Sequence, residues 1–123
     1  MPKNYSTDNF VLLIQQLKEP FDKLNPVMSH ANFFNLMKIN FELLADQVAS
    51  RYLKDRAAYQ GQLPLELEQQ YCKILLDSLS SGNLKVLDYI NWLDEVIWAL
   101  ENEQDIPVLP EEFFKEFLKG DFE

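Results

Sequence analysis

Apolar residues recur every three or four positions along this chain, and glycine and proline fall between the apolar-periodic segments rather than inside them. This spacing places apolar side chains on one face of a helix, and glycine and proline commonly mark helix ends. No segment alternates with a period of two for long enough to indicate a strand. We therefore predict an all-α fold: a single-domain bundle of about five helices over residues 1–123, with short connections and consecutive helices antiparallel.

The expected helix boundaries follow from capping residues and helix breakers. A first helix starts at Ser6 or Thr7 and is stopped by Pro20, and a third opens at Pro64 and closes at Gly82. The second follows Ser29 and meets neither glycine nor proline before Gly61, and the pattern leaves open whether residues 30–60 form one helix or two. Asn83 is expected to cap the fourth helix, and a short fifth runs from Pro110 to Gly120.

Size and composition are those of a globular domain, because 123 residues with 47% hydrophobic and 25% charged side chains can bury a core. The single cysteine, Cys72, closes no intramolecular disulfide, which fits a reducing compartment. The longest apolar run, residues 10–14, is too short for a signal peptide or a membrane span. We expect a cytoplasmic protein with no membrane partner.

Charge is distributed unevenly along the chain. Residues 1–85 hold nine acidic and nine basic residues, whereas residues 86–123 hold eleven acidic residues against Lys115 and Lys119. The formal net charge of −9 therefore comes entirely from the C-terminal third. A field of one sign over one region repels nucleic acid and attracts basic partners.

Residues for catalysis or ligand binding are scarce. His30 is the only histidine, so neither a two-histidine metal site nor a serine triad with a spare base can be built, and the three glycines lie too far apart for a phosphate-binding loop. Cys72 is expected to be a buried structural thiol and His30 a capping or surface residue. The only basic cluster, Arg51, Lys54 and Arg56, is interrupted by Asp55. We predict no enzyme activity, no cofactor, no metal and no nucleic-acid binding.

The stretch from Asp88 to Asp105 carries two tryptophans and six carboxylates without a basic residue. At 100° per residue, Val86, Ile90, Leu93, Ile97 and Leu100 form the buried stripe of the fourth helix. Trp92 falls at the flank of that stripe, where a large side chain seals the edge of a core. Trp98 falls on the far side, among acidic neighbours.

Two interpretations of Trp98 are open. In the first, Phe113, Phe114 and Phe117 fold back over Trp98 and bury it. In the second, Trp98 is an exposed anchor within an acidic ring, as binding hot spots often are.

The acids at the end of the fourth helix favour the second interpretation, since Glu101, Glu103 and Asp105 lie where the helix dipole disfavours negative charge. A helix that ends earlier, with these acids in a solvated loop, is the alternative. The candidate partner-binding residues are Asp88, Asn91, Asp94, Glu95, Trp98, Glu101, Asn102 and Asp105.

The run LLDSLSSGNLKVLDYINWLDEVI, Leu75 to Ile97, resembles the small acidic helical immunity proteins that neutralise bacterial toxins of the colicin and contact-dependent inhibition kind. The resemblance implies a bacterial inhibitor that binds a toxin with a basic surface, often a nuclease, and masks its active surface.

We therefore predict a non-enzymatic immunity protein or antitoxin. The sequence leaves three other readings and homo-oligomer formation open. One is an adaptor or secretion chaperone that binds an amphipathic segment in a groove lined by Met28, Met37 and phenylalanines. The others are a nucleic-acid mimic and a subunit of a larger assembly.

Overall fold

The computed structural model describes residues 9–24, 31–82, 84–110 and 113. These residues form four α-helices: α1 (Asn9–Leu24), α2 (Ala31–Ala58), α3 (Leu65–Ser80) and α4 (Val86–Glu101). The all-α prediction is confirmed, with no strand among the described residues, but the structure has four helices rather than about five. The expected helix from Pro110 to Gly120 lies outside the described residues except for Pro110 and Phe113.

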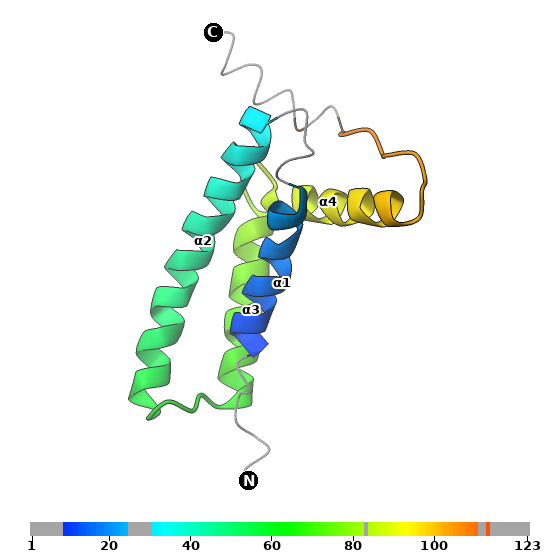
Figure 1. The fold of residues 1–123 in the computed structure, drawn as a ribbon. Coiled ribbons are helices and arrows are strands. Elements are labelled where there is room, and N and C mark those ends of the chain that lie inside the picture. The colour runs from blue at the N-terminus through cyan, green and yellow to red at the C-terminus, as the bar shows by residue number, and fades with distance from the viewer. Residues whose placement is uncertain (1–8, 25–30, 83, 111–112, 114–123) are drawn as a thin grey trace, which may run out of the picture.

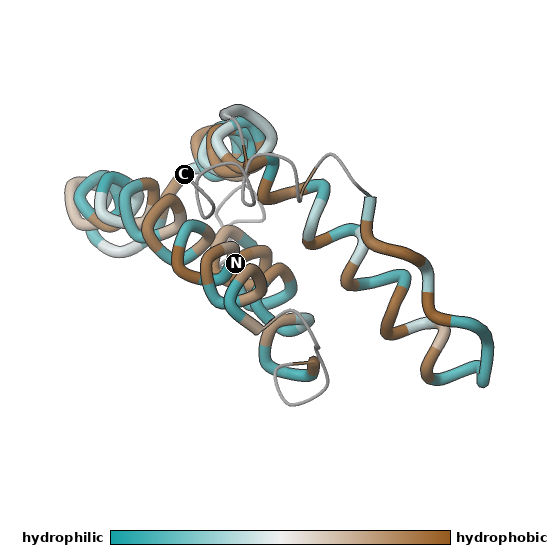
Figure 2. Tube along the Cα trace, turned by 90° about the horizontal axis from the view of Figure 1, so that it is seen from above, coloured by the Kyte–Doolittle hydropathy of each residue, from teal (hydrophilic) through white to brown (hydrophobic). Residues whose placement is uncertain are grey.

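Three of the helices lie along one direction and the fourth crosses them (Figure 1). The chain rises through α1, descends through α2 and rises again through α3, so these consecutive helices alternate in direction as predicted. The expectation of antiparallel neighbours is wrong for α4, which runs across one end of the other three. Viewed from above, α4 and the segment that follows it extend away from the bundle (Figure 2).

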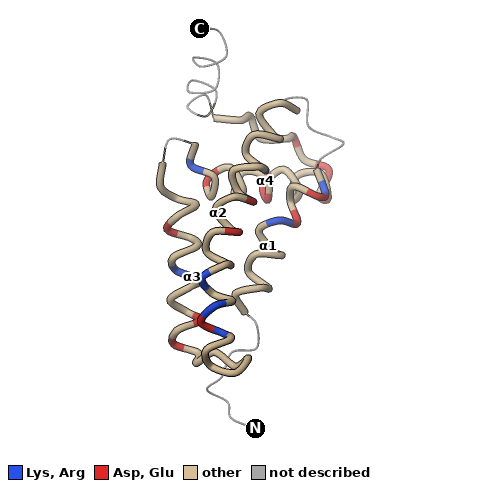
Figure 3. The backbone as a smooth tube through the Cα atoms, turned by 90° about the vertical axis from the view of Figure 1, so that its left-hand side faces the viewer, with Lys and Arg blue, Asp and Glu red and all other residues tan. Residues whose placement is uncertain are grey.

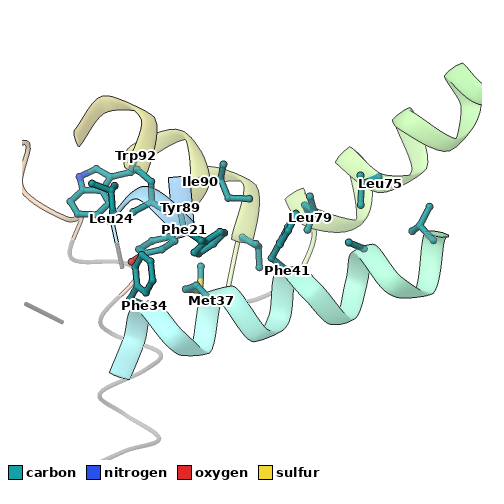
Figure 4. Close-up of a cluster of buried hydrophobic side chains, with 14 of the residues drawn as sticks. Phe21, Leu24, Phe34, Met37, Phe41, Leu75, Leu79, Tyr89, Ile90 and Trp92 are labelled. Carbon is teal, nitrogen blue, oxygen red and sulfur yellow. The ribbon is translucent and has the colours of Figure 1, made fainter. Parts of the chain in front are cut away.

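All four helices contribute to one hydrophobic core that is rich in aromatic rings. The ring of Phe21 on α1 lies 5.4 Å from that of Phe34 and 5.8 Å from that of Phe41, both on α2. Tyr89 of α4 reaches the same cluster beside Phe21 (Figure 4), with the two rings 6.1 Å apart. The Tyr89 ring also lies 5.4 Å from that of Phe33. Edge-to-face and offset pairs of this kind add stability beyond the apolar area that they bury. The core thus fixes α4 to α1 and α2 through Tyr89.

Pro20 does not stop α1, contrary to the sequence prediction, and lies buried inside the helix. The next turn carries Phe21 and Leu24, which are also buried. Burying two such side chains contributes roughly 3–6 kcal/mol, which offsets the ~3 kcal/mol that a proline costs inside a helix. Tertiary packing therefore extends α1 past its predicted end at Pro20. The predicted start of this helix, Ser6 or Thr7, lies outside the described residues.

The second predicted segment is one unbroken helix, which settles the question of one helix or two. Its 28 residues span about 42 Å. The turn that follows places Gly61 at a φ of +89°, and the Gly61 amide donates to the Arg56 carbonyl oxygen at 2.8 Å. This left-handed conformation suits glycine, so the predicted end of the segment is confirmed.

The third helix follows the prediction, because Pro64 immediately precedes it and Gly82 lies just beyond its end. The fourth begins at Val86, directly after Lys85 in a left-handed conformation. Its predicted cap, Asn83, lies outside the described residues.

Glu68 of α3 is the one charged side chain in the buried set of the described residues, only 1% exposed. Its Oε2 accepts a hydrogen bond from the backbone amide of Phe10 at 3.4 Å. Phe10 lies in the first turn of α1, where amides have no partner within the helix. The Glu68 carboxylate thus caps α1 from another helix, and its negative charge is favoured there by the helix dipole.

Candidate partner-binding surface

The buried face of α4 is broader than the predicted stripe and rotated toward Trp92. The predicted core residues Val86, Ile90 and Leu93 are buried, but Ile97 is only half-buried and Leu100 is 43% exposed. Ile97 and Leu100 lie toward the C-terminal end of α4, which extends past the other three helices (Figure 1), although Val96 and Ala99 on an adjacent face of the same turns remain buried. The additional buried residues of this helix are Tyr89, Trp92, Val96 and Ala99.

Trp92 and Trp98 occupy opposite environments, as the helical rotation predicts. Trp92 is 7% exposed and seals the edge of the core, with its ring 5.7 Å from that of Tyr89. Trp98 is 59% exposed. The proposal that the C-terminal phenylalanines cover Trp98 is wrong for Phe113, which packs 5.9 Å from the Tyr89 ring and 6.4 Å from the Phe33 ring. Phe114 and Phe117 lie outside the described residues.

Every candidate partner-binding residue is exposed, and seven of the eight lie on α4 or at its C-cap. Figure 3 shows acidic residues distributed over α4 and the chain that follows it. Their role in binding a partner stays a prediction. The exposed set comprises Asp88, Asn91, Asp94, Glu95, Trp98, Glu101, Asn102 and Asp105.

A tight turn ends α4 and determines where its last acids lie. The amide of Asn102 donates to the Trp98 carbonyl oxygen at 3.0 Å, and the amide of Gln104 donates to the Ala99 carbonyl oxygen at 2.8 Å. Between them Glu103 has a φ of +54°, the left-handed conformation that glycine usually takes after a helix. The sequence predicts three acids in a region where the helix dipole disfavours negative charge. Of these, Glu101 lies inside the last helical turn, whereas Glu103 and Asp105 follow the helix.

After this turn, residues 104–110 run back along α4 in an extended conformation (Figures 1 and 2). Side chains alternate along this segment: Leu109 is buried and Pro107 half-buried, whereas Ile106 is exposed and Val108 is 90% exposed. The segment thus covers part of α4 with one side and presents apolar groups to solvent with the other. Sequence reasoning did not identify Ile106 or Val108, although Pro107 and Pro110 signal a non-helical segment there.

The returning segment and α4 line two open hollows, and Glu95 contributes to both. The first, the Trp98 hollow, has a volume of about 390 Å³ and is lined by Glu95, Trp98, Ala99, Asp105 and Pro107. The second, the Trp92 hollow, has a volume of about 450 Å³ and is lined by Lys85, Asp88, Asn91, Trp92, Glu95, Pro110 and Phe113. Five of the predicted partner-binding side chains line one hollow or both: those of Asp88, Asn91, Glu95, Trp98 and Asp105.

The end of α1 adds a charged group that the sequence pattern did not place near α4. Lys23 and Glu19 form a salt bridge at 3.0 Å, and Asp94 lies close enough to feel both charges. Partial burial, followed by the nearby Glu19 carboxylate, raises the pKa of Asp94, while Lys23 lowers it. The hydrogen bond to Glu19 is the main reason that the pKa of Lys23 is raised. The charged form of Asp94 is therefore less favoured here than that of a fully solvated aspartate.

Two other kinds of site are relevant to the described part of the chain: a metal site and a reactive thiol. No three of its histidine, cysteine, aspartate and glutamate residues are grouped so that they could hold a metal ion. Cys72 is half-buried rather than fully buried, and burial together with the Glu68 carboxylate raises the pKa of its thiol. A raised pKa leaves less of the nucleophilic thiolate at neutral pH.

Two further expectations concern the core and the membrane. Met37 and the phenylalanines of α1 and α2 are buried, so they do not form the apolar groove expected of an adaptor. Met28 and His30 lie outside the described residues.

Within the described ranges, no helix combines the length and the apolar character needed to cross a membrane.

Compared with known proteins, the chain matches no protein family, no curated protein and no solved structure.

Proposed function

We propose that this protein is a non-enzymatic inhibitor, an immunity protein or antitoxin, that binds a basic protein toxin through α4 and the segment that follows it. The observation that carries the proposal is the exposed indole of Trp98, set among carboxylates on a surface without a basic residue between Asp88 and Asp105. Large aromatic anchors surrounded by polar residues dominate many protein–protein interfaces.

The charge of this surface supports a basic partner. Carboxylates on α4 and in the following turn would attract a positive surface over several ångströms and raise the association rate, an effect that salt screens. An interface of ~800 Å² per partner, the usual size for tight inhibitory complexes, would take about a tenth of the 8221 Å² surface of this protein. Binding there would mask the toxin by occupying its basic active surface, as nucleases need basic residues to hold phosphates.

The test is capture of partners from the native host, followed by a neutralisation assay. Wild-type protein, Trp98→Ala and the control Tyr59→Ala are compared at low and moderate salt. Tyr59 is an exposed aromatic residue at the far end of α2, so its removal changes apolar exposure without touching α4. A basic partner held by wild type and Tyr59→Ala, weakened by salt and lost from Trp98→Ala, is the expected result. Expressed alone, this partner should stop growth, and co-expression with the wild-type protein should restore it.

Other outcomes would refute the proposal. Capture that neither salt nor Trp98→Ala affects would favour an adaptor that binds through apolar contacts. The exposed aliphatic residues available for such contacts in the described part of the chain include Leu12, Ile39, Leu43, Leu53, Leu100, Ile106 and Val108. A captured DNA-binding protein without toxicity would favour the nucleic-acid mimic.

A further inference from the structure

We propose that the Trp98 hollow binds an arginine side chain of the partner. The inference rests on the proposed function, because it names the group by which a basic partner is anchored. The hollow is formed by two segments, α4 and the chain that returns along it, and its 390 Å³ is ample for a single side chain.

The walls of the hollow offer both parts of an arginine side chain a suitable surface. The indole of Trp98, the methyl group of Ala99 and the ring of Pro107 are apolar and can contact the aliphatic stem. A guanidinium stacked on the Trp98 ring would gain a cation–π interaction, for which tryptophan is the most favourable side chain. The hollow therefore suits a long side chain that is apolar along its length and cationic at its end.

Two carboxylates complete the site. Glu95 projects from the middle of α4, and the turn at Glu103 reverses the chain so that Asp105 lines the same hollow. Carboxylate oxygens accept the paired N–H groups of a guanidinium with better geometry than those of an ammonium. Among the described residues, none that lines the hollow is basic, and Lys23, the cation at the end of α1, is paired with Glu19. A cation from a partner would therefore meet two carboxylates without a competing positive charge from the described residues that line the hollow.

The neighbouring hollow provides a contrast within the same surface. The Trp92 hollow also contains carboxylates and an indole, but Lys85 lines it and Trp92 is almost completely buried. An incoming cation would meet the Lys85 ammonium there and find little exposed ring to stack on. A general attraction of cations to acidic residues would fill both hollows, whereas the proposed site binds in the Trp98 hollow alone.

The experiment uses the ¹⁵N-labelled full chain and three blocked pentapeptides at constant ionic strength: Gly-Gly-Arg-Gly-Gly and its counterparts with citrulline or lysine in place of arginine. Citrulline has the shape of arginine without the charge. Binding is followed through the indole N–H signals of Trp98 and Trp92. The arginine peptide should shift the Trp98 signal saturably and bind about fivefold more tightly than the citrulline peptide, which corresponds to ~1 kcal/mol for the contacts that depend on the positive charge. The lysine peptide should fall between them.

Two charge-matched variants locate the effect. Asp105→Asn should weaken binding of the arginine peptide severalfold. Asp88→Asn, which removes the same charge from the Trp92 hollow, should leave the affinity within about twofold. Equal binding of the arginine and citrulline peptides, equal weakening by both variants, or a larger shift at Trp92 would each overturn the inference.

The peptide titration and the capture experiment can fail independently. If a toxin is captured through Trp98 but the hollow shows no preference for arginine, the inference is wrong and the proposed function stands. If the hollow prefers arginine but no toxic partner is captured, the hollow is an arginine site and the proposed function is wrong.

Discussion

Replacing Glu103 with glycine should stabilise this protein by about 1 kcal/mol, although Glu103 lies in an acidic surface that we assign to partner binding. Glu103 has a φ of +54° in the turn that ends α4. A left-handed conformation costs a residue with a β-carbon roughly 1–2 kcal/mol, and glycine removes that cost. The greater flexibility of glycine in the unfolded chain reduces this gain by roughly 0.5–1 kcal/mol. Loss of a negative charge near the negative end of the helix dipole adds about 0.3 kcal/mol.

The variant Glu103→Gln separates backbone from charge, since it removes the charge but keeps the left-handed backbone strain. It should gain only about 0.3 kcal/mol, and that gain should vanish at about 1 M salt, where charges are screened beyond a few ångströms. The gain of Glu103→Gly should persist in salt, and its melting temperature should rise by about 4 °C. Urea unfolding followed by circular dichroism measures both variants. If Glu103→Gly is no more stable than Glu103→Gln at high salt, the turn is not strained and the reasoning fails.

Three further predictions use the same unfolding assay. Trp92→Ala should cost about 3–5 kcal/mol because it empties a core site, whereas Trp98→Ala should change stability by less than about 0.5 kcal/mol; equal losses would contradict the assigned burial. Glu68→Ala should cost about 1–2 kcal/mol because α1 loses its cap, and no loss would mean that water replaces the carboxylate. Asp94→Asn should be more stable than wild type at neutral pH, since Asp94 has a raised pKa when folded. This advantage should disappear as the pH falls below the ordinary Asp94 pKa of 3.8, where the residue is protonated in both states; an advantage that persists there would have another cause.

Local patterns predicted those parts of the fold that local physics controls. The ends of α2 and α3 follow from Gly61 and Gly82, which take a left-handed φ that residues with a β-carbon rarely adopt, and from Pro64, whose ring fixes φ. The orientations of Trp92 and Trp98 follow from the 100° rotation per residue. Both results depend only on residues within a few positions of one another.

The features that sequence missed depend on packing between distant segments. Pro20 destabilises a helix interior and is expected from the sequence to end α1, but the burial of Phe21 in the core offsets that cost. Leu100 lies on the expected face of α4 but near an end that extends past the bundle. The Trp98 hollow exists because residues 104–110 return along α4. No hydrophobic periodicity in the sequence predicts the path of that segment. The candidate residues could thus be named from the sequence, whereas the cavity beside them could not.

The cap that Glu68 provides has a consequence for the order in which the protein folds. Glu68 and Phe10 are 58 residues apart, so the first turn of α1 gains this partner only after a long loop has closed. By contrast, α2 and α3 are consecutive antiparallel helices joined by a short turn, and contacts between neighbours in sequence form early. We expect the hairpin of α2 and α3 to form first and to serve as the template on which the beginning of α1 becomes helical.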